Sequence, residues 1–317
     1  MKNIFITGGG GYIGTNLCKA LLSEGYNVTV LDTFWFGNYL KKNSKLRILK
    51  KDLRNITIKD LKNIDCIMHL ASIANDPAAE LDPKLTWETN VLYTKKLIEH
   101  AIKHKVKKFI FASSGSVYGI KKEKKVTENL KLLPITDYNK SKMIAERVIM
   151  SYSNEIKIFC IRPATVCGYS ENMRLDVAVN LLTFQALYKK KIKILGGNQI
   201  RPNIHVLDLC RVFVLFVDKN CKPGCYNAGF ENLKIIDIAR KIREKIPSKM
   251  TIIKKTNDPR SYRQDSTKLL NLGFRPKYSV EYAINELHEL YKSKKLKNLK
   301  NYYRVSFMKE NPNLFKS

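Results

Sequence analysis

The sequence lacks a long apolar run. Glycines interrupt the apolar N-terminus directly after Thr7, and no apolar run reaches the roughly 18 residues that are needed to span a bilayer. We therefore expect neither a secretory signal nor a membrane-spanning helix. Internal repeats and low-complexity linkers are also absent, and 44% hydrophobic with 27% charged residues is ordinary for a folded soluble protein. The chain is thus expected to be globular and cytoplasmic.

Acidic residues are scarce. The 28 Asp and Glu stand against 58 Lys and Arg, which gives a formal net charge of +30. Such a charge could indicate a nucleic acid, an anionic membrane surface or an acidic substrate. However, the lysines are spread along the whole chain, and only residues 292–300 form a local basic cluster. Dispersed lysines are typical of a solvated surface, so we predict that neither nucleic acid nor a membrane is a partner.

The seven cysteines are an odd number and lie mostly within apolar strand or helix patterns. This placement is typical of buried thiols in a reducing compartment. Cys221 and Cys225 are separated by three residues, but no second Cys/His pair at ligand spacing accompanies them. A metal site is therefore not predicted.

Apolar, β-rich runs alternate with helical patterns in the first half of the chain. The runs lie at 3–7, 27–31, 46–49, 65–70, 107–113 and 156–161, and the clearest helical patterns lie at 12–24, 85–104 and 137–152. This alternation predicts an α/β fold with a doubly wound parallel sheet, which binds ligands at the carboxyl ends of its strands. The rhythm loosens after about residue 165. We therefore predict a Rossmann domain over residues 1–165, with a returning segment near 204–230, and a smaller C-terminal α/β substrate domain over 166–317 that ends in a basic, polar tail.

The first apolar run leads directly into the glycine-rich segment Thr7–Gly14. Glycines at positions 8, 11 and 14 let the backbone turn tightly, let a phosphate approach, and let the next helix pack closely on the strand. A helix that starts near Tyr12 offers free N–H groups and its positive dipole end to an anion. The second run ends at Asp32, whose carboxylate would bind the 2′-hydroxyl of NAD and repel the 2′-phosphate of NADP. This order of features predicts NAD as the cofactor.

Tyr138 and Lys142 lie four residues apart at the start of an expected helix and therefore share one face of it. An ammonium beside a phenol lowers the pKa of the phenol from about 10, so Tyr138 becomes a usable general base for an alcohol. On its own, such a pair is also typical of a solvated surface. The apolar run 107–112, however, leads to Ser114, which places a hydroxyl at the carboxyl edge of a central strand. The glycine turn occupies the same edge.

At this point the sequence resembles the extended short-chain dehydrogenase/reductase family, especially its NAD-dependent nucleotide-sugar epimerases and dehydratases. The resemblance covers nearly the whole chain and rests on separate motifs: Thr7–Gly14 for the glycine motif, Asp52 and Leu53 for the adenine contact, 69–71 for the fourth strand, Asn90 for a structural asparagine, and Ser114, Tyr138 and Lys142 for the catalytic triad. It implies that Ser114 binds the C4 oxygen of the sugar, Tyr138 takes its proton, and Lys142 orients the cofactor. The cofactor-binding residues that it implies are Gly8, Gly11, Tyr12, Ile13, Gly14, Asp32, Asp52, Leu53, Leu70, Ala71, Asn90, Tyr138, Lys142 and Pro163.

The resemblance also implies substrate contacts. The implied substrate-binding residues are Ser114, Ser116, Asn180, Arg201, Arg260 and Arg263. Guanidinium groups suit bidentate contacts to phosphate, although each arginine alone is also consistent with a surface charge.

His69 and His205 lie in apolar runs and are expected to be core histidines whose hydrogen bonds are satisfied within the protein.

One departure from the family concerns the reaction. Family dehydratases place an Asp-Glu pair directly after the hydroxyl residue, where this chain has Gly115 and Ser116. Without those carboxylates, elimination of water lacks its acid and base. We therefore predict an NAD-dependent epimerase or 4-dehydrogenase that acts at C4 of a nucleotide-diphosphate hexose or heptose, as a homo-oligomer in surface polysaccharide biosynthesis. A catalytically silent dinucleotide sensor and a 4,6-dehydratase are the alternatives.

Overall fold

A seven-stranded, fully parallel sheet forms the larger part of the molecule. The computed structural model describes residues 2–253 and 261–315. The strand order is β10-β6-β5-β4-β1-β2-β3, and each neighbouring pair is parallel. The predicted doubly wound parallel sheet is confirmed. The strands are β1 (Asn3–Thr7), β2 (Asn27–Asp32), β3 (Leu46–Lys50), β4 (Cys66–His69), β5 (Lys108–Ala112), β6 (Lys157–Pro163) and β10 (Gly224–Ala228).

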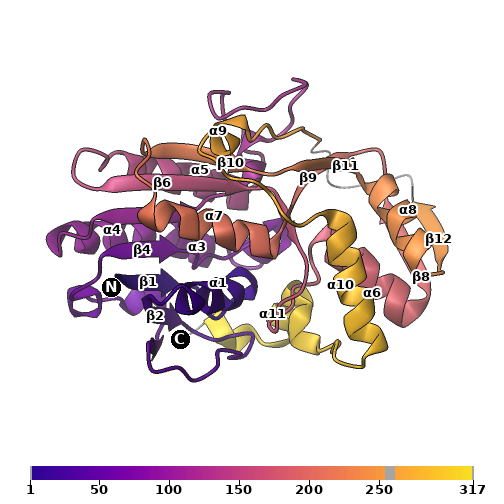
Figure 1. Ribbon diagram of the computed structural model, residues 1–317, viewed down its shortest axis with the longest axis horizontal. Helices are drawn as coiled ribbons and strands as arrows, with labels where there is room; N and C mark the ends of the chain where they lie inside the picture. The colour runs from indigo at the N-terminus through magenta and orange to yellow at the C-terminus, as the bar shows by residue number, and fades with distance from the viewer. Residues whose placement is uncertain (1, 254–260, 316–317) are drawn as a thin grey trace.

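Helices cover both faces of this sheet, and successive residues of β1 point to opposite faces because the strand period is two. Ile4 and Ile6 belong to the apolar cluster that contains Leu17 and Phe213, whereas Phe5 lies in the cluster on the other face. Figure 1 shows two of these helices, α1 and α7, side by side across the sheet. The flanking helices are α1 (Tyr12–Ser23) and α7 (Val206–Asp218) on the first face, and α4 (Tyr93–Lys103) and α5 (Asp137–Met150) on the second.

Two small sheets and three helices build the other part of the molecule. Strands β7 (Thr165–Cys167), β9 (Ile200–His205) and β11 (Glu231–Lys234) form one sheet, and β8 (Lys191–Leu195) pairs in parallel with β12 (Lys249–Ile253). Helices α6 (Ala178–Lys189), α8 (Ile235–Lys245) and α10 (Val280–Lys292) pack on one another. Between these elements, α7 and β10 return to the large sheet. The division at residue 165 stays a prediction.

Short helical segments occupy several connections. They are α2 (Asp76–Ala79), α3 (Pro83–Trp87), a π-helical turn η3 (Glu88–Leu92), α9 (Thr267–Leu270) and α11 (Arg304–Glu310), with 3₁₀ turns η1 (Leu53–Asn55), η2 (Ile58–Leu61), η4 (Gly115–Tyr118), η5 (Lys300–Tyr302) and η6 (Pro312–Phe315). The segment expected to be a polar tail is thus folded. It crosses from α10 towards the large sheet (Figure 1), where the side-chain amide of Asn301 donates to the backbone oxygen of Phe36 at 2.7 Å.

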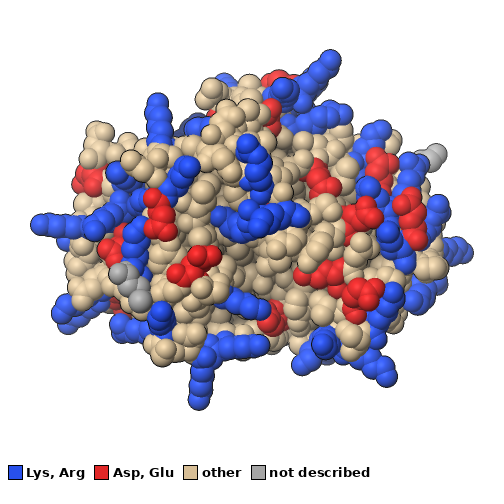
Figure 2. Space-filling view, in the orientation of Figure 1, with Lys and Arg blue, Asp and Glu red and all other residues tan. Residues whose placement is uncertain are grey.

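The charged residues are dispersed over the surface. On the face shown in Figure 2, lysines and arginines lie over the whole outline, with acidic groups between them. Within the described residues, no helix is both long and apolar enough to cross a membrane.

The two histidines expected in the core are buried and hydrogen-bonded. His69 contacts the hydroxyl of Thr7 at 2.6 Å and that of Thr94 at 2.7 Å, and burial lowers its pKa to about 3. His205 accepts from the amide of Leu207 through Nδ1 and lies 3.3 Å from Glu286 through Nε2. Both are the satisfied core histidines that the sequence predicted.

Candidate active site

The glycine turn between β1 and α1 is so tightly packed that side chains cannot enter it. A Cβ on Gly14 would lie 2.3 Å from the carbonyl oxygen of Gly8, and a Cβ on Gly8 would lie 2.6 Å from the amide nitrogen of Ala71. Gly8 also has a φ of +72°, a conformation that favours glycine. Gly11 is the N-cap of α1 and supplies no side chain to the first-turn amides. Those amides therefore remain free to bind an anionic ligand.

A cavity of about 220 Å³ opens beside this turn, at the carboxyl ends of β1, β2, β4 and β5. This is the edge at which doubly wound sheets bind ligands. The residues assigned to the cofactor from the sequence that line the cavity are Gly8, Gly11, Tyr12, Ile13, Gly14, Asp32, Asp52, Leu53, Leu70 and Ala71. A glycine turn with uncapped helix amides at one end and a carboxylate at the end of β2 is a donor set that fits a dinucleotide such as NAD.

Asp32 is held at the wall of the cavity by backbone amides. Its Oδ2 accepts from the amide of Gly10 at 2.9 Å, and its Oδ1 accepts from that of Phe34 at 2.7 Å. Burial raises the pKa of this carboxyl, while the two amides and the nearby positive charge of Arg304 oppose the increase. The fixed carboxylate is therefore in place to accept hydrogen bonds from a ribose hydroxyl.

Lys142 is buried at the β5 end of the cavity. Its Nζ donates to the carbonyl oxygen of Ala112 at 2.9 Å, and Ala112 itself lines the cavity. The ammonium also lies 4.9 Å from the ring centroid of Phe111. Burial lowers the pKa of Lys142 to about 7, and the carboxylate of Glu146 opposes this change. The amine therefore changes its charge near neutral pH.

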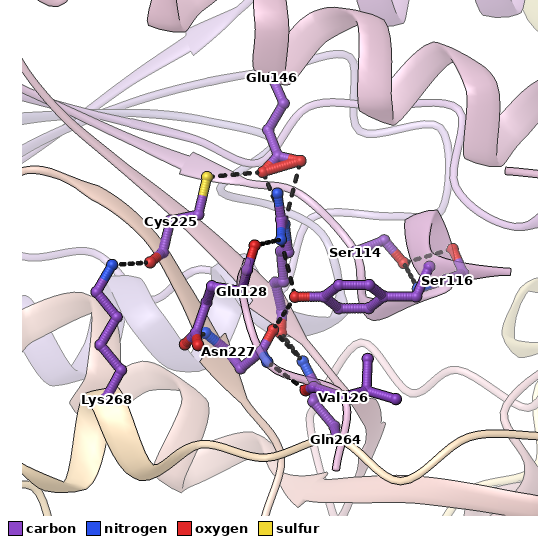
Figure 3. Close-up of polar contacts among 11 residues, drawn as sticks. Ser114, Ser116, Val126, Glu128, Glu146, Cys225, Asn227, Gln264 and Lys268 are labelled. Atoms are coloured by element: carbon purple, nitrogen blue, oxygen red, sulfur yellow. Dashed lines mark hydrogen bonds and ion pairs between the residues drawn. The ribbon is translucent and has the colours of Figure 1, made fainter. Parts of the chain in front are cut away.

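Tyr138 and Ser114 complete this end of the site. Tyr138 follows the N-cap Thr136 of α5, is half-buried, and is an electrostatic neighbour of Arg174, which lines the cavity. Ser114 lies two residues after the end of β5, and its hydroxyl is 2.7 Å from that of Ser116 (Figure 3). It also accepts from the Ser116 amide at 3.2 Å, so it caps the turn η4 as well. None of the three predicted catalytic residues lines the cavity itself, but Lys142 and Ser114 lie at the carboxyl end of β5 and Tyr138 shares the helix α5 with Lys142. Their catalytic roles stay predictions.

A buried hydrogen-bonded network supports α5 and η4 from behind (Figure 3). Arg162 of β6 donates to Glu146 of α5 at 2.8 Å and to the hydroxyl of Tyr118 in η4 at 2.8 Å. The Tyr118 hydroxyl in turn donates to the side chain of Asn227 at 2.8 Å, which also accepts from Gln264 at 3.0 Å. Burial disfavours the charge of Arg162, but Glu146, Tyr118 and Cys225 together outweigh this effect and raise the pKa of the guanidinium. The helix that carries Tyr138 and Lys142 is therefore fixed to the turn that follows Ser114.

The geometry agrees with what comparisons with known proteins show. Residues 4–229 match the family described as "NAD dependent epimerase/dehydratase family". The chain belongs to this family. Its cofactor, NAD, is the one that the glycine turn and Asp32 predicted, and the resemblance stated from the sequence is confirmed.

Individual relatives are similar over most of their length. A UDP-glucose 4-epimerase of Lactobacillus helveticus is 29% identical over 306 residues, which cover 87% of this chain and 92% of the relative. A solved UDP-glucuronic acid 4-epimerase from Bacillus cereus, in complex with UDP-glucuronic acid and NAD, has a TM-score of 0.80 at 27% identity and covers 92% of this chain and 99% of its own. TunA, an NAD-dependent NDP-hexosamine 5,6-dehydratase involved in tunicamycin biosynthesis, has a TM-score of 0.85 at 24% identity, and the match covers 92% of this chain and 98% of TunA. At this identity the likeness shows the fold alone.

Some residues that the family resemblance assigned to cofactor or substrate lie behind the cavity. Asn90 is buried, and its side chain pairs with both backbone polar groups of Ile73. Asn180 is fully buried: its Oδ1 accepts from the amide of Gly168, and its Nδ2 donates to the hydroxyl of Tyr12. The polar atoms of both side chains are thus engaged within the protein, and their assignments to cofactor and substrate stay predictions. Pro163, at the end of β6, does not line the cavity either.

Two of the predicted substrate arginines, Arg201 and Arg263, do not line the cavity. Arg201 is half-buried on β9, and Arg263 is exposed while its backbone oxygen pairs with the amide of Val126. Arg260 lies outside the described residues. Their roles as substrate ligands stay predictions.

Sequence reasoning missed several lining residues, and four of them come from the second half of the chain. Arg174 pairs with Asp176 through two hydrogen bonds of 2.6 and 3.1 Å. Burial lowers the pKa of the Arg174 guanidinium, but neighbouring groups, Asp176 first among them, raise it by more, so the pKa is raised overall. No local pattern marks these residues, because they reach the cavity from chain segments far from the glycine turn. The four are Asn172, Arg174, Arg304 and Met308.

One cluster in the described residues has metal-ligating groups close together. Ligand atoms of Glu146, Cys160 and Cys225 lie within 4.8 Å of one another. Both carboxylate oxygens of Glu146, however, already accept from the guanidinium of Arg162, at 2.8 and 3.3 Å. The cluster is therefore better explained as part of the network behind α5.

Proposed function

We propose that this protein is an NAD-dependent 4-epimerase of a nucleoside-diphosphate sugar, with UDP-hexoses as the first candidates. The observation that supports this proposal is the contact of Lys142 with Ala112, which lines the same cavity as the glycine turn and Asp32. Tyr138 lies one helical turn before Lys142 on α5, and Ser114 follows the end of β5. A protein that only sensed a dinucleotide would not need a general base at this place. Relatives named as UDP-sugar 4-epimerases support the same reaction.

The protein's own residues divide the proposed chemistry between them. Tyr138 removes the proton from the C4 hydroxyl, Ser114 holds the same oxygen by a hydrogen bond, and Lys142 supplies positive charge beside both. NAD, when bound, accepts the hydride from C4 and returns it to the opposite face of the 4-keto sugar. Tyr138 then gives its proton back to the oxygen, so the protein and its cofactor end unchanged.

The space around Gly115 disfavours dehydration. A Cβ at this position would lie 3.1 Å from the carbonyl oxygen of Pro163, 3.2 Å from Oε1 of Gln264 and 3.2 Å from the hydroxyl of Tyr262. The position at which family dehydratases carry a carboxylate is therefore tightly packed in this chain. Loss of water from C5 and C6 would need an acid and a base that this site lacks.

The test is incubation of purified enzyme with UDP-glucose, UDP-N-acetylglucosamine, UDP-glucuronic acid and a GDP-heptose in D₂O, with products identified by NMR and mass. Conversion to the C4 epimer without deuterium on carbon is expected for at least one of them. Tyr138→Phe serves as the matched inactive control. A 4-keto-6-deoxy product would contradict the proposal. A 4-keto sugar formed with a stoichiometric amount of NADH would show that the enzyme is a 4-dehydrogenase and not an epimerase. Binding of NAD without turnover of any of these sugars would favour the sensor.

The finer expectations rest on the resemblance alone. We propose a homo-oligomeric cytoplasmic enzyme whose product enters surface polysaccharide biosynthesis. We also propose that Ser116, Arg201, Arg260 and Arg263 contact the substrate.

A further inference from the structure

The C-terminal segment forms one wall of the cofactor cavity. Both Arg304 and Met308 of α11 line the cavity, and Met308 is buried in an apolar cluster that also contains the catalytic Tyr138. The ring of Phe307 lies 5.8 Å from that of Phe36, in the loop that follows Asp32. Helix α11 therefore joins the adenosine end of the predicted site, marked by Asp32, to its catalytic end.

Arg304 is buried and carries a charge without a carboxylate in contact with it. Within the described part of the chain, its guanidinium donates only to neutral oxygens: the backbone of Asn301 at 2.7 Å, of Asn172 at 3.3 Å and of Met173 at 2.9 Å, and the side chain of Asn172 at 2.5 Å. It also stacks 4.1 Å from the ring centroid of Phe36. Burial, followed by repulsion from Arg174, lowers its pKa to about 10.

The second arginine in the cavity differs in this respect. The charge of Arg174 is compensated by the carboxylate of Asp176, at 2.6 Å and 3.1 Å. Arg304 is attracted by Asp32 and Asp176 without hydrogen-bonding to either, so within the described residues no carboxylate in contact offsets the cost of burying its charge. An anionic ligand in the cavity would offset this cost. Asn172 connects Arg304 to the glycine turn. Its side-chain oxygen accepts from Arg304, and its side-chain nitrogen donates to the carbonyl oxygen of Gly10 at 2.6 Å.

We propose that Arg304 is a cofactor-binding residue that supplies positive charge to the phosphates of the dinucleotide, and that α11 is an integral wall of the NAD site. This inference rests on the proposed function for its ligand. Guanidinium groups form strong charge-assisted bonds to phosphate, and the two negative charges of a pyrophosphate match a cation that has no carboxylate in contact. The helix dipole of α1 and Arg304 would then act on the same anion from two sides.

A purely structural role is the competing explanation. Arg304 could serve only to hold 172–173 and Phe36 in position. Two substitutions separate the explanations. Arg304→Gln keeps amide donors but removes the charge, whereas Arg304→Lys keeps the charge in a side chain that cannot reproduce the planar fork. If the role is structural, it depends on the planar guanidinium, and both variants should lose NADH affinity to the same extent. If Arg304 binds phosphate by its charge, Arg304→Lys should keep much of the NADH affinity that Arg304→Gln loses.

The experiment measures binding to cofactor-free protein. NADH is titrated by fluorescence, and ADP and adenosine are compared as competitors, since they differ only in the phosphates. We expect Arg304→Gln to weaken NADH and ADP by about 10- to 100-fold and adenosine by less than about 3-fold, as loss of a charge-assisted hydrogen bond would. Arg304→Lys should lie within about tenfold of wild type. The amount of NAD(H) that remains bound through purification should follow the same order.

The control is Arg211→Gln. Arg211 also stacks on a phenylalanine, at 5.0 Å from the Phe274 centroid, and donates to a backbone oxygen, but it does not line the cavity. Arg211→Gln should leave the affinity for NADH unchanged. The inference is overturned if Arg304→Gln binds NADH within about twofold of wild type, or if it weakens adenosine as much as ADP. Wild-type protein that does not bind NADH at all would instead overturn the proposed function and the inference together. Circular dichroism checks the fold of each variant, and if Arg304→Gln does not fold, Arg304→Met is measured against Arg304→Lys by the same criteria.

Discussion

Replacement of Lys142 by methionine should change how the stability of the cofactor-free protein depends on pH. Lys142 is 3% exposed, and burial lowers its pKa from 10.5 to about 7. The folded chain therefore binds this proton more weakly than the unfolded chain does. Below pH 7 the buried ammonium costs stability, and the cost decreases as the pH rises from about 7 towards 10.5.

The size of the effect follows from the two pKa values. The full cost at low pH corresponds to roughly 5 kcal/mol, and between pH 6 and pH 9 about 2–3 kcal/mol of it should disappear. Methionine has no proton to bind, so Lys142→Met should be more stable than wild type at pH 6 by a margin that shrinks at pH 9. Contributions of all other titrating groups cancel in the comparison.

Urea unfolding of both proteins at pH 6, 7, 8 and 9 measures this margin, with bound cofactor removed because a ligand of the folded state would add its own stability. Lys140→Met is the matched control, since Lys140 lies on the same helix but is exposed. Its difference from wild type should stay constant within about 0.5 kcal/mol. A difference between Lys142→Met and wild type that does not vary with pH would show that Lys142 is not an ammonium held in a desolvated place.

Three further substitutions test the site. Asp32→Ala should narrow the preference for NAD over NADP in a binding titration, because the carboxylate repels a 2′-phosphate; equal affinity of the wild type for both would contradict this role. Tyr138→Phe should keep the fold and NADH affinity while turnover falls by about 10²- to 10⁴-fold, the usual cost of losing a general base; near wild-type turnover would exclude Tyr138 as the base. Gly115→Asp should lower the free energy of unfolding by about 1–3 kcal/mol, because its Cβ meets three oxygen atoms at 3.1–3.2 Å. It should form no 4-keto-6-deoxy sugar, and such a product detected by mass would refute this reasoning.

The parts of the site that the sequence predicts are those with short-range signals. The turn at Gly8, Gly11 and Gly14 and the carboxylate of Asp32 follow from a strand, a turn, a helix and a second strand in direct succession. Tyr138 and Lys142 share a helix face because they are four residues apart. In each case the spacing along the chain fixes the spacing in the structure, so local rules suffice.

Other features depend on contacts between distant segments. Residues 85–104 give the pattern of one regular helix, but the structure widens it into a π-helical turn over Glu88–Leu92. Within this turn Asn90 pairs with the backbone of Ile73, a contact that helical periodicity alone does not indicate. Arg304 is a stronger example, since it lies in a segment that composition marks as a polar tail, yet it lines the cavity and is held there by contacts with Asn172 and Phe36.

The space around Gly115 is set by distant parts of the chain. Two of the three oxygen atoms that a side chain there would meet belong to Tyr262 and Gln264, nearly 150 residues later in the sequence. Gln264 is fixed in turn, because its side-chain nitrogen donates to the backbone of Arg162 at 2.7 Å and to Asn227. A side chain at position 115 would therefore need these neighbours to shift by a few tenths of an ångström. Gln264 belongs to the network that also joins Arg162 to Glu146 of α5, so such a shift would act on the support of the helix that carries Tyr138 and Lys142.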